Sequence, residues 1–200
     1  MQSTEVTHPS TGRAGSSSST PGDGWVAYKD GTAVRLVSRA GKEHSRRFAE
    51  LAAAIRALPP MTLILDGEVA IFDDKLISRF EWFRKRPEDV ASTPPIYMAF
   101  DYLYLGGRVL RPLPLWERRE HLEHVVENDL QLIFPSRRLA SNGLDAWEQV
   151  RERGYEGLVR KDESSPYRGG RTLSWIPAAR LPGRAARLDS GSRLSRSGMV

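Results

Sequence analysis

The sequence predicts an α+β fold in which mainly antiparallel sheets are flanked by helices. Two observations predict it: two extended runs are joined by the hairpin signal Asp30-Gly31, and later strand patterns are separated by single helix patterns. A chain of this length can build one core but seldom two. Strands joined by hairpins favour antiparallel pairing over a doubly wound parallel sheet.

The first predicted elements are a hairpin and a helix. Residues 25–29 and 32–38 have the pattern of strands, and the Asp-Gly pair between them is typical of hairpin turns. Apolar residues at helical spacing then predict a helix over 43–58, which Pro59 and Pro60 end. Its predicted core face consists of Phe48, Leu51, Ala52, Ile55 and Leu58.

The rest of the pattern alternates strands with single helices. Apolar and alternating runs indicate strands, while helical periodicity, with Gly154 as a terminator, indicates helices. The predicted strands are 62–72, 96–105, 130–134 and 155–161, and the predicted helices are 78–84, 115–126 and one that begins at Asp145.

The two ends differ from the middle in composition. Residues 1–24 are rich in Ser, Thr, Gly and Pro, and 177–200 in Arg, Ser, Gly and Pro, without the apolar periodicity that offsets the entropy of ordering. We therefore predict disordered tails around one domain at 25–176. The chain has no cysteine and no apolar run of about 20 residues, which predicts a cytoplasmic protein without disulfides or thiolate metal sites.

Positive charge is concentrated in the C-terminal tail. The formal net charge is +5, yet residues 177–200 hold five arginines against the single acid Asp189. The basic pI is therefore weak evidence for a nucleic-acid surface on the predicted domain.

A pair of acids inside an apolar strand is the first candidate for chemistry. Asp66 and Glu68 flank Gly67 within the apolar run 63–71. Buried carboxylates need a cation or hydrogen-bond donors, and a glycine allows another group to approach the backbone closely. The ordinary alternative is a bulge or turn with solvated acids.

A second acid-glycine pair, Glu156-Gly157, opens a short apolar strand that ends at Lys161. Glu156 and Lys161 fall on opposite faces, so a shared ligand must be reached from the two ends of the strand; a surface ion pair is the alternative. Carboxylates with a lysine match a magnesium-bound triphosphate, because oxygen ligands bind the metal and an ammonium group binds a phosphate. Phe100 could stack on a purine, although a central strand aromatic is usually core.

The motifs follow one another in an order that is similar to a known family. They are Ser-Arg-Ala-Gly at 38–41, Leu-Asp-Gly-Glu at 65–68, Ala-Phe-Asp-Tyr-Leu at 99–103, Glu-Gly-Leu-Val-Arg-Lys at 156–161 and Ser-Trp at 174–175. In this order they resemble the adenylation domain of ATP-dependent DNA ligases, in particular the bacterial end-joining type. The resemblance runs from about Trp25 to Trp175.

The resemblance implies a covalent nucleotidyltransferase (ATP-grasp-like) fold that seals nicks in double-stranded DNA through an enzyme-adenylate. It implies that Glu68 and Glu156 bind ribose or magnesium, Phe100 stacks on adenine, Lys161 contacts a nucleotide phosphate, and Arg39 lies near the phosphate- and nick-binding surface. The implied cofactors are ATP and Mg²⁺, and the implied partner of the monomer is nicked DNA.

The chain departs from the family pattern at both ends. The family's first motif is Lys, any residue, Asp, Gly, any residue, Arg, with a lysine that becomes adenylated, and the printed sequence contains no copy of it. Lys29 precedes Asp30-Gly31 without the spacer residue, which turns an extended side chain to the opposite face, so we predict a solvated turn lysine and no nucleophile. Pro177 follows Trp175 where the family has a lysine-containing strand. We expect a fragment that is truncated or altered in reading frame at both ends and too short for the ligases' second domain.

Two classes of function remain open. The first is a protein of the ATP-dependent DNA ligase family, acting in DNA repair or recombination, that lacks the nucleophile and has negligible ligation activity alone. The alternative is a non-catalytic remnant that binds nucleotide or, through its Arg-rich tail, nucleic acid. An RNA ligase or capping relative shares the same motifs.

Overall fold

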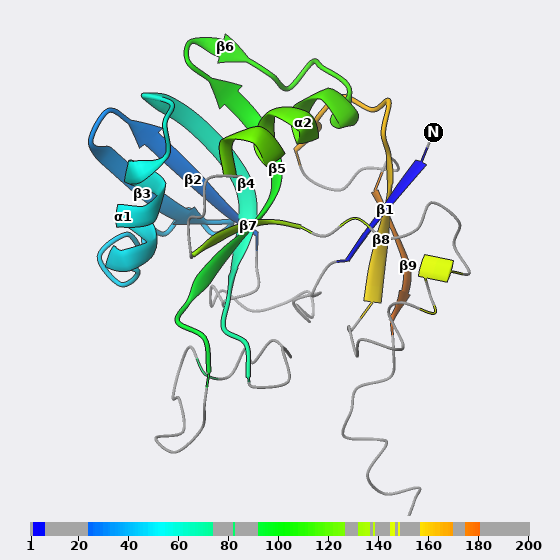
Figure 1. Cartoon of the computed structure of the whole chain (residues 1–200), viewed down its shortest axis with the longest axis horizontal. Helices are drawn as coiled ribbons and strands as arrows, with labels where there is room; N and C mark the ends of the chain where they lie inside the picture. The colour runs from blue at the N-terminus through cyan, green and yellow to red at the C-terminus, as the bar shows by residue number, and fades with distance from the viewer. Residues whose placement is uncertain are drawn as a thin grey trace, which may run out of the picture.

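The chain folds into two β-sheets accompanied by helices (Figure 1). The structure is a computed structural model that describes residues 2–6, 24–73, 82, 92–126, 132–136, 138, 145–146, 148, 157–169 and 175–180. Its strands are β1 (Gln2–Val6), β2 (Trp25–Asp30), β3 (Ala33–Ser38), β4 (Thr62–Ala70), β5 (Ile96–Leu105), β6 (Arg108–Val109), β7 (Ile133–Pro135), β8 (Gly157–Asp162) and β9 (Trp175–Arg180). Its helices are α1 (Ala49–Ala57) and α2 (Leu115–Val126). Neither of these two described helices is long and apolar enough to cross a membrane.

The larger sheet has the strand order β3-β2-β4-β5-β6, and β7 pairs with β5. The β5 and β7 strands are parallel, and the other described pairs of this sheet are antiparallel. The prediction of mainly antiparallel sheets is therefore confirmed. The predicted hairpin is also present, with Asp30 paired to Ala33 and a turn at Gly31 and Thr32. Gly31 has a φ of 56°, in the left-handed region that favours glycine.

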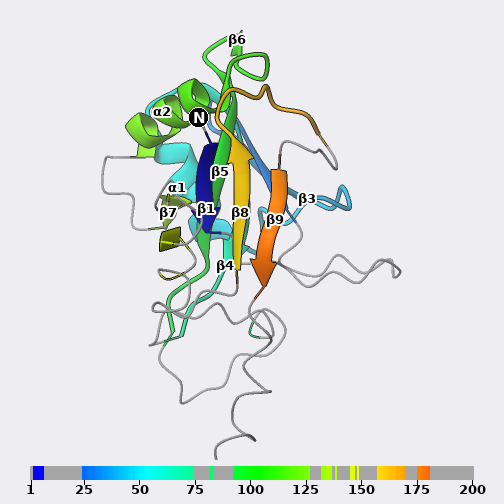
Figure 2. The same ribbon diagram turned by 90° about the vertical axis from the view of Figure 1, so that its right-hand side faces the viewer.

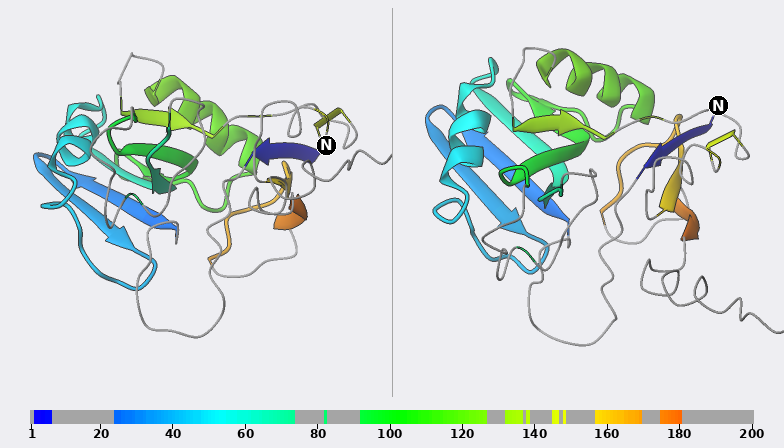
Figure 3. Two further views of the ribbon diagram at one scale, coloured as in Figure 1. Left: turned by 90° about the horizontal axis from the view of Figure 1, so that it is seen from below. Right: turned by 60° about the horizontal axis from the view of Figure 1, so that its bottom comes forward.

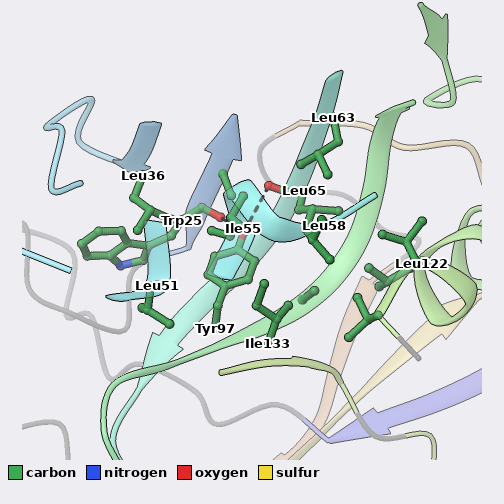
Figure 4. Close-up of a cluster of buried hydrophobic side chains, with 14 of the residues drawn as sticks. Trp25, Leu36, Leu51, Ile55, Leu58, Leu63, Leu65, Tyr97, Leu122 and Ile133 are labelled. Carbon is green, nitrogen blue, oxygen red and sulfur yellow. Dashed lines mark hydrogen bonds between the residues drawn. The ribbon is translucent and has the colours of Figure 1, made fainter. Parts of the chain in front are cut away.

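One face of this sheet is covered by α1 and α2 and holds the main core (Figure 4). Its strand residues include Trp25, Ala27, Leu36, Leu63, Leu65, Tyr97 and Tyr102, and its helix residues include Leu51, Ile55, Leu122 and Val125. The predicted core face of the first helix is confirmed, because Phe48, Leu51, Ala52, Ile55 and Leu58 are all buried. Full burial of one such Leu or Ile side chain contributes about 1.5–3 kcal/mol.

Helix α1 begins at Ala49, later than the predicted start at 43. The residues just before it form hydrogen bonds with β3 instead. The His44 amide donates to the Leu36 carbonyl at 2.8 Å, and the Leu36 amide donates to Ser45 Oγ at 2.9 Å. These bonds compete with helix formation, and helical periodicity does not reveal them.

Tyr97 crosses over β4 at Gly67, inside the core (Figure 4). Its hydroxyl donates to the carbonyl oxygens of Trp25 at 2.9 Å and Leu65 at 3.1 Å. A Cβ at residue 67 would lie 2.4 Å from the Met98 carbonyl oxygen and 2.8 Å from Tyr97 Cζ. The predicted role of Gly67 in allowing a close approach is therefore confirmed, and the approaching groups belong to β5.

Gly67→Ala is expected to lower the free energy of unfolding by about 1–3 kcal/mol, because the Met98 main chain is fixed by pairing with β4 and the Tyr97 ring is fully buried. Urea denaturation measures this loss. Gly24→Ala is the control, since its Cβ would meet only the Gly67 carbonyl at 3.9 Å, an ordinary contact. Equal effects of the two substitutions would contradict the packing described for Gly67.

The smaller sheet consists of β1, β8 and β9, with β8 in the middle (Figure 2). Both outer strands correct a prediction. Residues 2–6 form β1, so the expectation of disorder throughout 1–24 is wrong there, because composition does not show main-chain pairing with β8. Strand β9 continues to Arg180, past the predicted boundary at 177; the ladder passes Pro177 through a register shift, where an edge strand tolerates proline.

The remaining elements agree with prediction where they are described. β5 and α2 have the predicted bounds, while β4, β7 and β8 differ from theirs by a few residues. The predicted helix at 78–84 and most of the helix from Asp145 lie outside the described residues. Helix α1 lies far from the smaller sheet, whereas α2 extends toward it (Figure 3).

Candidate functional site

A bulge in β5 sets the position of Phe100. Across β4 and β5, Asp66 pairs with Asp101 and Gly67 pairs with Ala99, which leaves Phe100 without an opposite residue. A bulge breaks the alternation of a strand and re-aims the extra side chain. Phe100 is half-buried, unlike the fully buried Ala99 and Asp101 beside it. Phe100 is therefore not a fully buried core residue, which was the alternative to a purine-stacking role.

The acids of β4 lie on the face of the sheet opposite α1. Leu63 and Leu65 belong to the core under the helices, so alternation along the unbulged β4 places Asp66 and Glu68 on the other face. Glu68 is buried, with 5% of its surface exposed. The alternative of solvated acids is therefore wrong for Glu68, whereas Asp66 is half-buried; the bulge of that alternative lies on the neighbouring strand β5.

Lys161, in β8, joins this face from the smaller sheet. Its Nζ lies 5.5 Å from the centre of the Phe100 ring, and its side chain is buried. Two residues that are 61 positions apart in the sequence thus meet, and together they offer an aromatic surface and a cation.

Asp66 is part of the same polar group. It accepts a hydrogen bond of 2.9 Å from the Tyr167 hydroxyl. Burial raises the pKa of Asp66 and the nearby Asp101 carboxylate raises it further, whereas the bond from Tyr167 and the charge of Lys161 lower it. When the pKa of a carboxyl group is raised in the folded state, the free energy of unfolding falls as the pH rises through that pKa. Ionised Asp66 therefore destabilises the folded protein.

Two buried arginines of α2 complete the surroundings. Arg118 forms a bidentate pair with Asp101, with Nε and Nη2 at 2.7 and 2.8 Å from the two carboxylate oxygens. Arg119 donates to the Phe100 carbonyl at 3.3 Å and to Ser136 Oγ at 2.7 Å. Sequence reasoning missed both arginines, although they occupy the helix face of Leu115 and Leu122 at helical spacing.

Lys29 is buried, contrary to the prediction of a solvated turn lysine. It alternates with Trp25 and Ala27 on the face that α1 covers, and its Nζ donates to the Leu58 carbonyl at the end of that helix. Burial lowers its pKa. The predicted orientation away from the candidate site agrees with this placement, because Lys29 and Glu68 are on opposite faces of the sheet.

Arg39 lies one residue beyond β3, exposed, and its amide donates to the Gly24 carbonyl at 2.9 Å. Ser38, the residue before Arg39, pairs with Trp25, and Trp25 pairs in turn with Gly67, the neighbour of Glu68. Arg39 and Glu68 therefore stand two strands apart, about 10 Å by ordinary strand spacing.

The predicted metal ligands are described only in part. Glu68 is placed as above, whereas Glu156 directly precedes β8 and lies outside the described residues. Among the residues that the structure describes, no group of three His, Asp or Glu side chains is arranged to hold a metal ion. Asp101 is paired with Arg118, and Glu68 and Asp66 are the two carboxylates that β4 places on the face opposite α1.

Residues 22–176 match the family model described as ATP dependent DNA ligase domain. The chain belongs to the ATP-dependent DNA ligase family. This confirms the resemblance inferred from the ordered motifs, and the matched residues include every predicted site residue.

Relatives in the ligase family are about one-third identical to this chain over the aligned residues. The multifunctional non-homologous end joining protein LigD of Mycobacterium bovis is 33% identical over 158 residues, which are 76% of this chain and 20% of that protein. A probable DNA ligase of Anaeromyxobacter is 33% identical over 165 residues, 76% of this chain and 31% of that protein. The chain thus spans between a fifth and a third of these relatives.

Solved ligase structures show the same fold. The ligase domain of M. tuberculosis LigD superposes with a TM-score of 0.69 at 25% identity, covering 88% of this chain and 52% of that one. A mycobacterial DNA ligase D complexed with ATP and MES gives 0.67 at 26% identity, covering 88% and 53%. The predicted adenylation-domain fold is confirmed at this level.

Proposed function

We propose that this chain is a ligase adenylation domain that binds ATP with magnesium on the face of Glu68, Phe100 and Lys161, without becoming adenylated at Lys29. The observation that carries the proposal is the approach of the Lys161 ammonium to the Phe100 ring on the sheet face that the helices leave open.

Each residue has a role that its chemistry supports. Stacking of a base on an aromatic ring contributes about 1–3 kcal/mol, which assigns adenine to Phe100. Lys161 supplies a point charge for a phosphate, and burial strengthens that interaction relative to water. Glu68, with Glu156, would supply carboxylate oxygens to Mg²⁺, a hard cation that binds through few carboxylates and the nucleotide phosphates.

The covalent step needs a lysine nucleophile, and the lysine in the described part of this site, Lys161, is assigned to a phosphate contact. An attacking lysine must reach the α-phosphate. Lys29 instead lies on the sheet face that α1 covers, and its Nζ donates to the Leu58 carbonyl. Its lowered pKa makes the amine more available for reaction, but its position on the opposite face prevents contact with the nucleotide.

Incubation with magnesium and ATP labelled at the α-phosphate tests this. We expect equilibrium dialysis to show bound ATP and denaturing electrophoresis to show no stable label on the chain. A full-length end-joining ligase assayed in parallel provides the positive control. Covalent label on this chain would refute the assignment, and mapping it to Lys29 would refute the orientation of that residue as well.

DNA binding is proposed for the β3 side of the domain. Exposed basic side chains occur on β3, in the loop after it and on α1: Arg35, Arg39, Lys42, Arg46, Arg47 and Arg56. Nicked duplex DNA should bind here mainly through its phosphates, with an affinity that falls with salt.

The double substitution Arg39→Ala/Lys42→Ala is expected to lower the slope of log affinity against log salt by about two, since each lost phosphate contact removes about one. Fluorescence anisotropy at several salt concentrations measures the slope. Removal of residues 181–200 is the comparison. A slope that depends only on that segment favours the alternative of a tail-mediated polyanion binder.

A further inference from the structure

We propose that Arg118 and Arg119 are positioning residues that fix the spacing between the Phe100 ring and the Lys161 ammonium, and with it the spacing of base and phosphate that the site accepts. This inference rests on the proposed function. Phe100 lies in β5, where the strand paired with the outer edge changes from β7 to β6.

The outer edge of β5 has a gap in its strand pairing. β7 pairs with residues 97–99, and β6 pairs with residues 104–105. The backbone between them still needs hydrogen-bond partners. Arg119 donates to the Phe100 carbonyl at 3.3 Å, the Tyr102 amide donates to Asp101 Oδ1 at 2.8 Å, and the Leu110 amide donates to the Leu103 carbonyl at 2.9 Å. Arg119 therefore holds the backbone of the bulge that aims the ring.

Arg118 links the next residue of β5 to the segment after β8. Its side chain and that of Asp101 are both 0% exposed, and the pair is bidentate. The remaining guanidinium nitrogen donates to the carbonyl oxygens of Leu113 and Ser165, the latter at 3.1 Å. One planar side chain thus contacts three separate parts of the chain, which fixes their relative positions.

Ser165 is in turn fixed relative to Lys161. Its amide and hydroxyl both donate to the Asp162 carbonyl, at 3.1 and 2.6 Å, in the turn that follows β8. Asp162 is the next residue after Lys161. A continuous path of covalent and hydrogen bonds therefore runs from Phe100 through Asp101, Arg118 and the turn to Lys161.

Stability alone is a poor explanation for this buried ion pair. The cost of removing both charges from water can exceed their attraction, and apolar pairs of similar volume are often as stable. Unlike an apolar pair, Arg118 and Asp101 form directional hydrogen bonds with each other, and Arg118 forms a further one with Ser165. Those bonds determine where Lys161 lies relative to the ring.

The paired substitution Asp101→Leu/Arg118→Met separates the two roles. It removes the directional bonds without leaving a lone buried charge. We expect an unfolding midpoint well above that of Arg118→Met alone. We expect an ATP affinity reduced about five-fold or more, as for the loss of base stacking alone. Arg119→Lys, which keeps the charge and loses the planar fork, is the second variant and is expected to act in the same direction. Arg108→Met, at an exposed position on β6, is the control and should bind ATP as the wild type does.

Repetition of these measurements in a Phe100→Leu background supplies the decisive readout. Because the arginines act through the ring, we expect their substitution to change ATP affinity by less than about two-fold once the ring is gone. Equal reductions in both backgrounds, or none in either, would overturn the positioning role. Failure of the wild-type chain to bind ATP overturns the proposed function together with this inference, whereas normal wild-type binding with uncoupled variants overturns the inference alone.

Discussion

Replacing Arg118 alone by methionine is expected to lower the free energy of unfolding by about 3–5 kcal/mol, because the substitution leaves Asp101 charged and buried without its partner. Asp101 is 0% exposed and accepts both strong bonds of the pair from this one side chain. Urea denaturation followed by circular dichroism measures the loss. For a domain of this size such a loss is a large part of the total stability.

Two comparisons make this prediction specific. The paired variant Asp101→Leu/Arg118→Met should recover most of the lost stability, since no lone charge remains. Arg35→Met breaks an ion pair with Glu43 whose side chains are 62% and 49% exposed, and it should cost no more than about 1 kcal/mol. An Arg118→Met variant as stable as the Arg35 variant would contradict the burial of the Asp101 pair.

Replacing Lys161 by glutamine is expected to weaken ATP binding by about 10- to 150-fold. A hydrogen bond to a charged group contributes about 1.5–3 kcal/mol, and every 1.4 kcal/mol is a factor of ten in affinity. The substitution keeps a polar side chain of similar length but removes the positive charge beside Phe100. Isothermal titration calorimetry with ATP and magnesium measures the change.

Lys29→Gln is the matched control for this experiment. Both lysines are buried, but Lys29 projects to the α1 face and bonds the Leu58 carbonyl. Its substitution should leave ATP affinity unchanged even where it changes stability. Equal losses of affinity from the two substitutions would contradict the assignment of the lysines to opposite faces.

Local sequence patterns predicted the elements whose own side chains determine them. Strand β5 and helix α2 appear with the predicted bounds, and the core face of α1 is buried as its spacing indicates. Strand β1 was missed because its pairing with β8 uses main-chain groups, which carry no pattern in the residue types.

The buried charged residues show where sequence reasoning was incomplete. Lys29 was assigned to a wet turn from the following Asp30-Gly31, yet period two from Trp25 and Ala27 places it on the buried face. Arg118 and Arg119 lie on the otherwise apolar face of α2, and their burial was likewise not predicted because they are charged. In both cases the residue spacing indicated a buried position. The residue type argued against burial, because charged side chains are seldom buried without partners.

A shared nucleotide site for Phe100 and Lys161 was suggested by their chemistry and by the family resemblance, whereas local spacing along the chain gave no sign of their contact. Their separation of 61 positions leaves no local pattern that joins them, and their contact depends on how the smaller sheet meets β5. The role of Glu156 stays a prediction, since that residue lies outside the described part of the chain.

The most direct measurement is a crystal structure of this chain with ATP and magnesium. We predict adenine stacked on Phe100 and a phosphate oxygen within hydrogen-bond distance of Lys161 Nζ, with Lys29 still bonded to Leu58. ATP bound on the α1 face, or bound with its base away from Phe100, would contradict the proposed site.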